Sequence, residues 1–176
     1  MVFTWLAPDQ PGFLDFAYRV RSLAPHYQTT LVSPYALTQP EFAISGVAHL
    51  VLPHSDSRAG WIAYMLASAR LIHVRKPACT VLLHSMLAPM VWLVGNSPVA
   101  LYWNEHPSRF TASPPGHPWF KRVARNLALK VFFLHAARKA DLVMPIGEAH
   151  YQELLRLGCR PERVRLLHMG VDASFA

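Results

Sequence analysis

Short hydrophobic runs alternate with longer amphipathic stretches along most of the chain. The runs are rich in β-branched and aromatic residues and are closed by proline, polar or charged residues, as buried strands are. Between them, apolar positions recur three and four residues apart, which is typical of helices that cover one face of a sheet. This pattern predicts strands over residues 2–7, 28–32, 47–52, 80–84, 99–103, 142–146 and 164–167. It predicts helices over residues 13–23, 61–74, 86–94, 118–139 and 148–157.

The alternation of strands and helices predicts an α/β fold, a Rossmann-like parallel sheet with helices on both faces. Several strands, residues 99–103 among them, are continuously apolar, as expected for strands buried on both sides. Ligands of such sheets bind beyond the carboxyl ends of the strands. Catalytic and ligand-binding residues are therefore expected in the loops that follow the first, fourth and fifth strands.

The length of 176 residues favours one domain. Cys79 and Cys159 are far apart and have no further Cys or His ligands around them, so neither a disulfide framework nor a thiolate metal site is indicated. Both are expected to be buried thiols in a reducing compartment. Residues 1–13 lack the basic and apolar pattern of a signal peptide, and a cytoplasmic location is expected.

Residues 77–104 contain no charged side chain over a stretch longer than a bilayer needs. His84, Pro89 and the Gly-Asn-Ser-Pro sequence at residues 95–98 interrupt this stretch. The interruptions favour a strand, a short helix and a second strand over one membrane-spanning helix.

Basic residues are concentrated in the middle of the chain. The whole sequence has 17 Lys and Arg against 10 Asp and Glu, and residues 58–139 carry 11 of the bases and a single acid, Glu105. Such a field attracts nucleic acid, anionic lipid or a phosphorylated substrate. A nucleic-acid partner is not expected, because the sequence has no helix-turn-helix or RNA-binding motif and only four of its bases are Lys.

The helix expected over residues 118–139 is amphipathic, and two environments for it stay open. One side carries a stripe that is expected to face the core: Trp119, Phe120, Val123, Leu127, Val131 and Leu134. The opposite side mixes cationic and apolar residues: Lys121, Arg122, Arg125, Leu129, Phe132 and Phe133. This mixture suits a helix that sinks into an anionic bilayer surface, which predicts a peripheral membrane protein. It equally suits burial beneath another domain or loop.

The last part of the sequence contains two motifs. Residues 140–148 read ADLVMPIGE, and residues 161–172 read PERVRLLHMGVD. They resemble the end of the N-terminal domain in family-four glycosyltransferases of the GT-B fold. There an Ala-Asp pair opens a strand, a Ser-Glu pair starts the next helix, and a strand ends in Asn-Gly-Val-Asp. Gly147 stands here for the serine, and His168-Met169 precede Gly-Val-Asp. The resemblance is strong over residues 140–176 and weak elsewhere.

The resemblance implies that residues 1–176 form one acceptor-side domain of a retaining glycosyltransferase. Such an enzyme transfers a sugar from a nucleotide sugar to a glycan or lipid-linked acceptor. No metal or other cofactor is implied, and the nucleotide sugar is expected to bind mainly to a C-terminal donor domain that this sequence lacks. The chain alone is therefore expected to be inactive. The alternative is a non-catalytic Rossmann-like module that binds a partner.

The candidate site residues lie in the loops singled out above. His106 follows the fifth strand and is the candidate catalytic residue, because similar enzymes have a histidine there that contacts the sugar or the acceptor. Asn104, Glu105 and Arg109 share its loop. His84 ends the fourth strand and is either a ligand or a buried histidine with satisfied hydrogen bonds. Gly12 and Phe13 open the first helix, whose backbone N–H groups can hold a phosphate or an acceptor oxygen.

Overall fold

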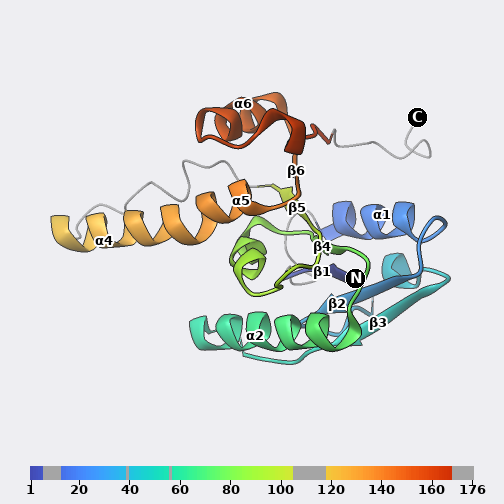
Figure 1. Cartoon of the computed structure of the whole chain (residues 1–176). Helices are drawn as coiled ribbons and strands as arrows, with labels where there is room; N and C mark the ends of the chain where they lie inside the picture. The colour runs from blue at the N-terminus through green and yellow to red at the C-terminus, as the bar shows by residue number, and fades with distance from the viewer. Residues whose placement is uncertain (6–12, 39, 56, 105–117, 168–176) are drawn as a thin grey trace.

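The computed structural model describes residues 1–5, 13–38, 40–55, 57–104 and 118–167, which form one parallel sheet flanked by helices (Figure 1). Six strands pair in the order β3-β2-β1-β4-β5-β6, and each neighbouring pair is parallel. The strands are β1 (Val2–Phe3), β2 (Thr29–Ser33), β3 (Val47–Val51), β4 (Thr80–Leu82), β5 (Val99–Trp103) and β6 (Leu142–Pro145). The predicted Rossmann-like α/β fold is confirmed.

Helices cover both faces of the sheet, because its strands are apolar on both sides. Helix α1 (Phe13–Leu23) packs Phe16 and Val20 on one face, against Leu31 and Tyr102. Helices on the other face include α2 (Arg58–Arg75), the 3-10 helix η2 (Ser85–Trp92) and α6 (Glu148–Arg156). Two short 3-10 helices, η1 (Pro40–Phe42) and η4 (Pro161–Arg163), lie in the connections before β3 and after α6. As predicted, residues 77–104 fold as strand, short helix and strand.

The seventh predicted strand, residues 164–167, is not a regular strand. It runs beside β6 through one parallel bridge between Val143 and Val164. The backbone amides of Arg165 and Leu167 donate to the carbonyls of Val143 and Pro145, both at 2.9 Å. Pro145 has no N–H to donate in return, so a parallel ladder cannot continue here.

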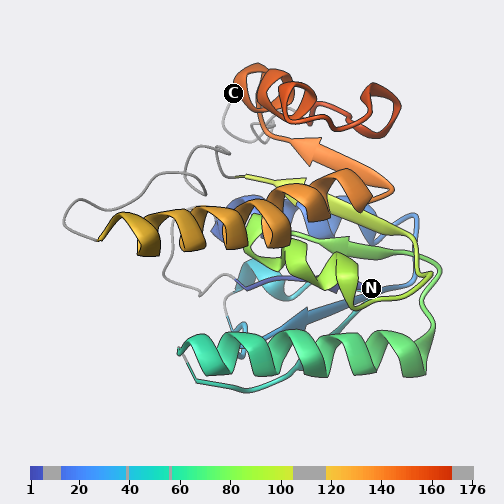
Figure 2. The same cartoon turned by 60° about the vertical axis from the view of Figure 1, so that its left-hand side comes forward.

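The predicted helix over residues 118–139 is present in three parts. They are α4 (Trp119–Leu129), a π-helical turn η3 (Lys130–Leu134) and α5 (His135–Lys139). Figures 1 and 2 show α4 projecting beyond the sheet, while α5 lies against the body. The long helix therefore has a packed end and a projecting end.

The stripe expected to face the core is exposed over α4, which corrects the prediction. Trp119, Val123 and Leu127 expose 70%, 57% and 62% of their surface. The reason is positional: α4 extends past the sheet, whereas η3 and α5 pack on η2. Only from Phe133 onward does the helical segment bury its apolar residues.

Two further sequence-based expectations have different outcomes. Among the described helices, none has both the length and the hydropathy needed to cross a bilayer. Cys159 is buried as predicted, and burial raises the pKa of its thiol to about 11. The prediction that Cys79 is buried is wrong, because Cys79 lies in the exposed connection between α2 and β4.

Candidate functional site

The strand order reverses between β1 and β4. The chain builds the sheet outward from β1 to β3 and then returns to place β4 on the other side of β1. At such a reversal the connections leave the sheet in opposite directions, which opens a binding position at the carboxyl ends of the two strands. Thr4 and Trp5 follow β1 at this position, and His84 follows β4. The carboxyl ends of β1 and β4 therefore lie side by side.

His84 is nearly buried at this point and exposes 8% of its surface. Its Nδ1 accepts a hydrogen bond from the backbone amide of Met86 at 3.0 Å, which caps the start of η2. A neutral ring that accepts at Nδ1 carries its proton on Nε2. Its ring lies edge-on to Phe16 of α1, with centroids 6.2 Å apart. His84 thus has a structural role, and its contact with a ligand stays a prediction.

A carboxylate, a guanidinium and a phenol form a network beside His84. The Tyr102 hydroxyl donates to Asp15 Oδ2 at 2.7 Å. Arg19 donates from Nη2 to the Tyr102 oxygen at 2.9 Å and from Nε to Asp15 Oδ2 at 3.0 Å. The Arg19 guanidinium also lies 4.2 Å from the centre of the Tyr102 ring. Burial and the hydrogen bond to Asp15 raise the pKa of Tyr102 well above its usual value.

Sequence reasoning missed this network. Asp15 and Arg19 are four residues apart on a predicted helix, so their ion pair could have been expected from spacing. Their third partner is 87 residues away from Asp15 and belongs to an apolar strand. Phe16, which also contacts Tyr102 edge-on at 6.0 Å, joins the network to His84.

Asn104, one of the predicted ligands, ties two loops of this edge together. Its side-chain oxygen accepts from the Ser85 backbone amide at 3.1 Å and from the Ser85 hydroxyl at 3.0 Å. The ends of β4 and β5 are thereby held side by side. Contact between Asn104 and a substrate stays a prediction.

A second polar group lies among aromatic rings at the ends of β1, β2 and β3. The His54 ring lies 4.7 Å from Trp5 and 5.0 Å from Tyr64, between ring centroids. Tyr64 donates to the backbone oxygens of Thr4 and Val32 at 2.9 and 3.0 Å, which braces two strand ends. His54 Nδ1 is 2.8 Å from the Leu52 carbonyl, to which a protonated Nδ1 donates. Sequence reasoning did not identify this cluster.

Several predicted site residues lie outside the described ranges: Gly12, Glu105, His106 and Arg109. Phe13 is the first residue of α1, where it was predicted. Within the described part of the chain, no group of three or more Asp, Glu, His or Cys side chains is placed to hold a metal ion. One hollow is lined by Arg21, Ala24, Pro25, Ala43, Ile44 and Ser45. It lies at the amino edge of the strands, opposite the polar network, and contains no second ionisable group.

Comparisons with known proteins show the fold. No protein-family model matches the sequence, and no curated protein sequence matches it. Among solved structures, Anabaena Alr3699/HepE in complex with UDP and glucose aligns with 97% of this chain at 11% identity, with a TM-score of 0.58. UDP-N-acetylglucosamine 2-epimerase from Rickettsia bellii aligns with 94% at 11% identity and a TM-score of 0.62. Phytolacca americana apo UGT2 aligns with 97% at 10% identity and a TM-score of 0.56.

The chain spans about half the length of these proteins: 45% of HepE, 43% of the epimerase and 52% of UGT2. The likeness agrees with the GT-B-like architecture expected from the motifs at residues 140–172.

Proposed function

We propose that this chain is the acceptor-side domain of a retaining glycosyltransferase. In this proposal the whole enzyme transfers a sugar from a nucleotide sugar to a glycan or lipid-linked acceptor. Support comes from the motifs at residues 140–172 and from a fold shared with HepE, whose structure holds UDP and glucose. The nucleotide sugar would bind mainly to a second domain, and the reaction would need no metal.

The polar network at the carboxyl edge carries the proposal. Asp15 and Arg19 expose 20% and 13% of their side chains, so a ligand can reach both. A carboxylate accepts hydrogen bonds from sugar hydroxyls, and a guanidinium donates them. Phe16 and Tyr102 are buried beneath these charges, with 2% and 1% of their surface exposed, so a ligand would meet the two charged side chains and not the rings. The network lies where α/β sheets with this strand order bind their ligands.

A titration followed by NMR tests the binding part of the proposal. The labelled chain would be titrated with a panel of oligosaccharides and, separately, with UDP and UDP-glucose. We expect at least one glycan to shift the resonances of Asp15, Phe16, Arg19 and Tyr102 saturably. We expect the uridine nucleotides to shift none of them.

Two variants sharpen this experiment. Arg19→Gln should weaken glycan binding about tenfold or more, because a charged hydrogen bond contributes about 1.5–3 kcal/mol. Arg21→Gln is the matched control, since Arg21 is exposed on the same helix and lies at the hollow on the opposite edge. Equal affinities of the two variants would contradict the assignment of the site. Micromolar binding of UDP-glucose to this chain would contradict the placement of the donor on a second domain.

His106 is the proposed catalytic or positioning residue of the reaction. In a transferase assay of this domain together with its donor domain, His106→Ala should lower turnover about ten- to a hundredfold or more, because a positioning or general acid-base role commonly contributes at least that much. Folding should be unaffected, which thermal unfolding would check. Unchanged turnover in a folded variant would remove His106 from the mechanism.

A further inference from the structure

The projecting helix α4 presents an unusual number of large apolar side chains to solvent. Trp119, Phe120, Val123 and Leu127 each expose more than half of their surface. At 100° per residue, three of them, Trp119, Val123 and Leu127, fall within an arc of about 80°. We call the four residues the α4 stripe. In a monomeric protein such a continuous apolar surface indicates a contact with another body.

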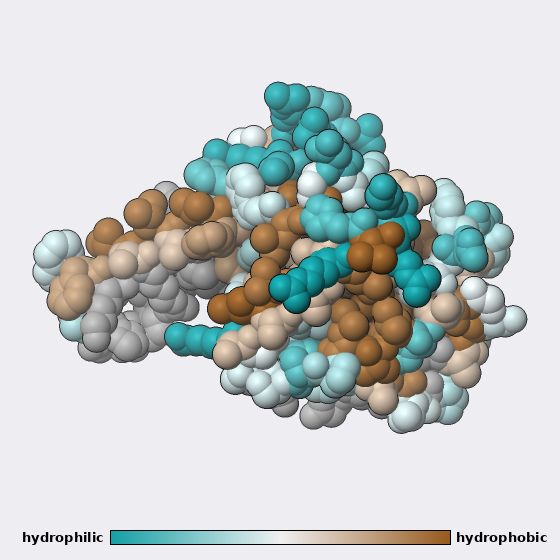
Figure 3. Space-filling view, turned by 60° about the horizontal axis from the view of Figure 1, so that its bottom comes forward, coloured by the Kyte–Doolittle hydropathy of each residue, from teal (hydrophilic) through white to brown (hydrophobic). Residues whose placement is uncertain are grey.

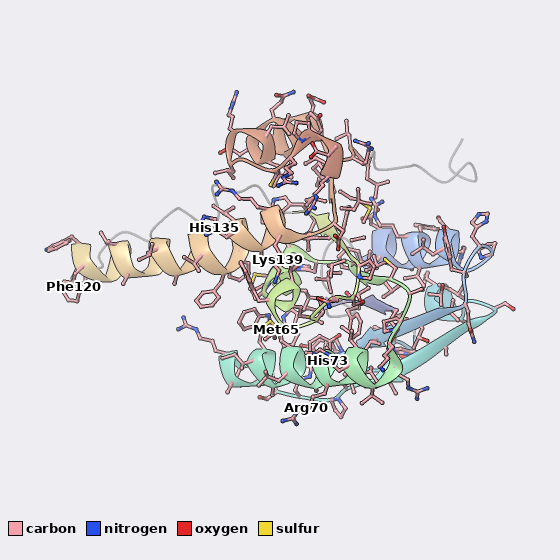
Figure 4. All side chains as sticks on the ribbon, in the orientation of Figure 1. Met65, Arg70, His73, Phe120, His135 and Lys139 are labelled. Atoms are coloured by element: carbon pink, nitrogen blue, oxygen red, sulfur yellow. The ribbon has the colours of Figure 1, made fainter. Side chains whose placement is uncertain are left out.

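The α4 stripe is also accessible as a unit. Figure 4 places Phe120 at the free end of α4, and His135 and Lys139 at the end that joins the body. Lys139 lies over the Trp92 ring of η2 at 4.9 Å, which anchors that end. Figure 3 shows hydrophobic residues gathered along the projecting helix. A flat surface can therefore meet the stripe without first meeting the sheet.

The charge of the same helix indicates which kind of surface the α4 stripe contacts. Residues 118–139 contain six Lys and Arg and no Asp or Glu, so the segment carries a formal charge of +6. Lys121, Arg122 and Arg125 occupy helix positions outside the arc of the stripe. A second copy of the chain would bring the same positive charge against the first, which disfavours pairing through α4. An anionic lipid surface offers both the apolar interior and the opposite charge.

We propose that α4 is a membrane-docking helix that lies in the interface of an anionic bilayer with the α4 stripe inserted. The positive charge of the segment would hold the helix at the anionic surface while the stripe enters the acyl boundary. This inference rests on the exposure and charge of α4 and is independent of the proposed sugar transfer. It would hold for a binding module as well as for an enzyme.

Vesicle flotation tests the proposal on the whole chain. One set of vesicles contains phosphatidylcholine alone, and the other contains equal parts of phosphatidylcholine and phosphatidylglycerol. We expect binding to the anionic vesicles to be stronger by about tenfold or more, and to fall when the salt is raised from low to molar concentration. Equal binding to both sets, or binding to neither, would overturn the proposal.

Substitutions in the stripe identify the surface. Trp119→Ser with Leu127→Ser should reduce the partition coefficient on anionic vesicles at least tenfold, because two large apolar groups no longer enter the bilayer. Ile62→Ser with Val74→Ser is the matched control: these residues are 49% and 78% exposed on α2 and should not matter. Equal losses in the two double variants would overturn the assignment to α4.

Two further measurements separate a bilayer from a protein partner. Replacing Lys121, Arg122 and Arg125 by Gln should abolish the preference for anionic vesicles; a retained preference would contradict the proposal. Brominated acyl chains should quench tryptophan fluorescence in the parent chain, and less so in Trp119→Phe. Light scattering without lipid should show a monomer. A dimer that is lost in the stripe variant and that does not bind vesicles would overturn the proposal in favour of self-association.

Discussion

The two ends of the helical segment from Trp119 to Lys139 have opposite environments. Both ends combine apolar residues with arginine and lysine. At the α5 end, Leu134, Ala136 and Ala137 are 3%, 0% and 1% exposed. At the α4 end, Leu127 is 62% exposed. Helical periodicity thus predicted the helix itself, but burial depended on whether another element lies opposite.

The largest expected effect is a difference between two identical substitutions at the two ends. Leu134→Ala should lower the free energy of unfolding by about 2–5 kcal/mol, because it removes a fully packed side chain and leaves a cavity. Leu127→Ala should change it by less than about 0.5 kcal/mol. Urea unfolding followed by circular dichroism measures both. Equal effects would mean that α4 is covered by protein and would contradict the difference in burial between the two ends.

A smaller effect is expected when side chains are enlarged instead. Ala136→Leu should destabilise the fold by about 1–3 kcal/mol, since its position in the core has no room for three more carbons. Ala128→Leu, at an exposed position of α4, should leave the stability almost unchanged because alanine and leucine are both good helix formers. Thermal unfolding of the two variants provides the test. A loss of stability in Ala128→Leu would reveal a close neighbour of α4.

The smallest expected effect on stability is that of a substitution at Tyr102, in the packed body of the protein. Tyr102→Phe should lower the free energy of unfolding by about 1 kcal/mol, the net value of its hydrogen bond to Asp15.

The pKa values of Tyr64 and Tyr102 are both raised by burial, so the folded state keeps these protons when the unfolded chain loses them. The stability that they confer is therefore complete below about pH 10, the usual pKa of tyrosine, and is lost as the pH rises above it.

Unfolding experiments between pH 8 and 11 check that dependence, with Tyr27→Phe as the control because Tyr27 is exposed. The decline above about pH 10 should be weaker in Tyr102→Phe than in the parent chain or the control. An identical decline in all three proteins would mean that Tyr102 ionises as freely in the folded state as in the unfolded one.

Much of the fold was predictable from local chemistry. The bounds of β5 were predicted correctly because Pro98 and Asn104 enclose a purely apolar run. Helix α2 starts three residues earlier than predicted, because Ser57 Oγ accepts from the Gly60 amide and caps it. β4 ends earlier than predicted, since His84 leaves the strand to cap η2. Such errors at element ends come from side chains that compete for backbone hydrogen bonds.

The site was predictable in position more than in composition. Parallel strands place their carboxyl ends at one edge, so His84 and Asn104 could be assigned there from their order in the chain. The contact between Tyr102 and Asp15 depends on how α1 packs across the sheet, and no local signal encodes that. Likewise, the stripe of α4 has the periodicity of a core helix, although it lies beyond the sheet.

The π-helical turn Lys130–Leu134 separates the packed end of the long helix from the projecting end. Such turns hold one residue more than an α-helical turn. Adding or removing a single residue there would rotate α4 about the helix axis by about 100°, while α5 remained packed on η2. The direction in which the tryptophan and leucine side chains point is thus set by the length of one turn. In sequences that differ by one residue at this turn, the apolar side of the same projecting helix would face a different direction and contact different surroundings.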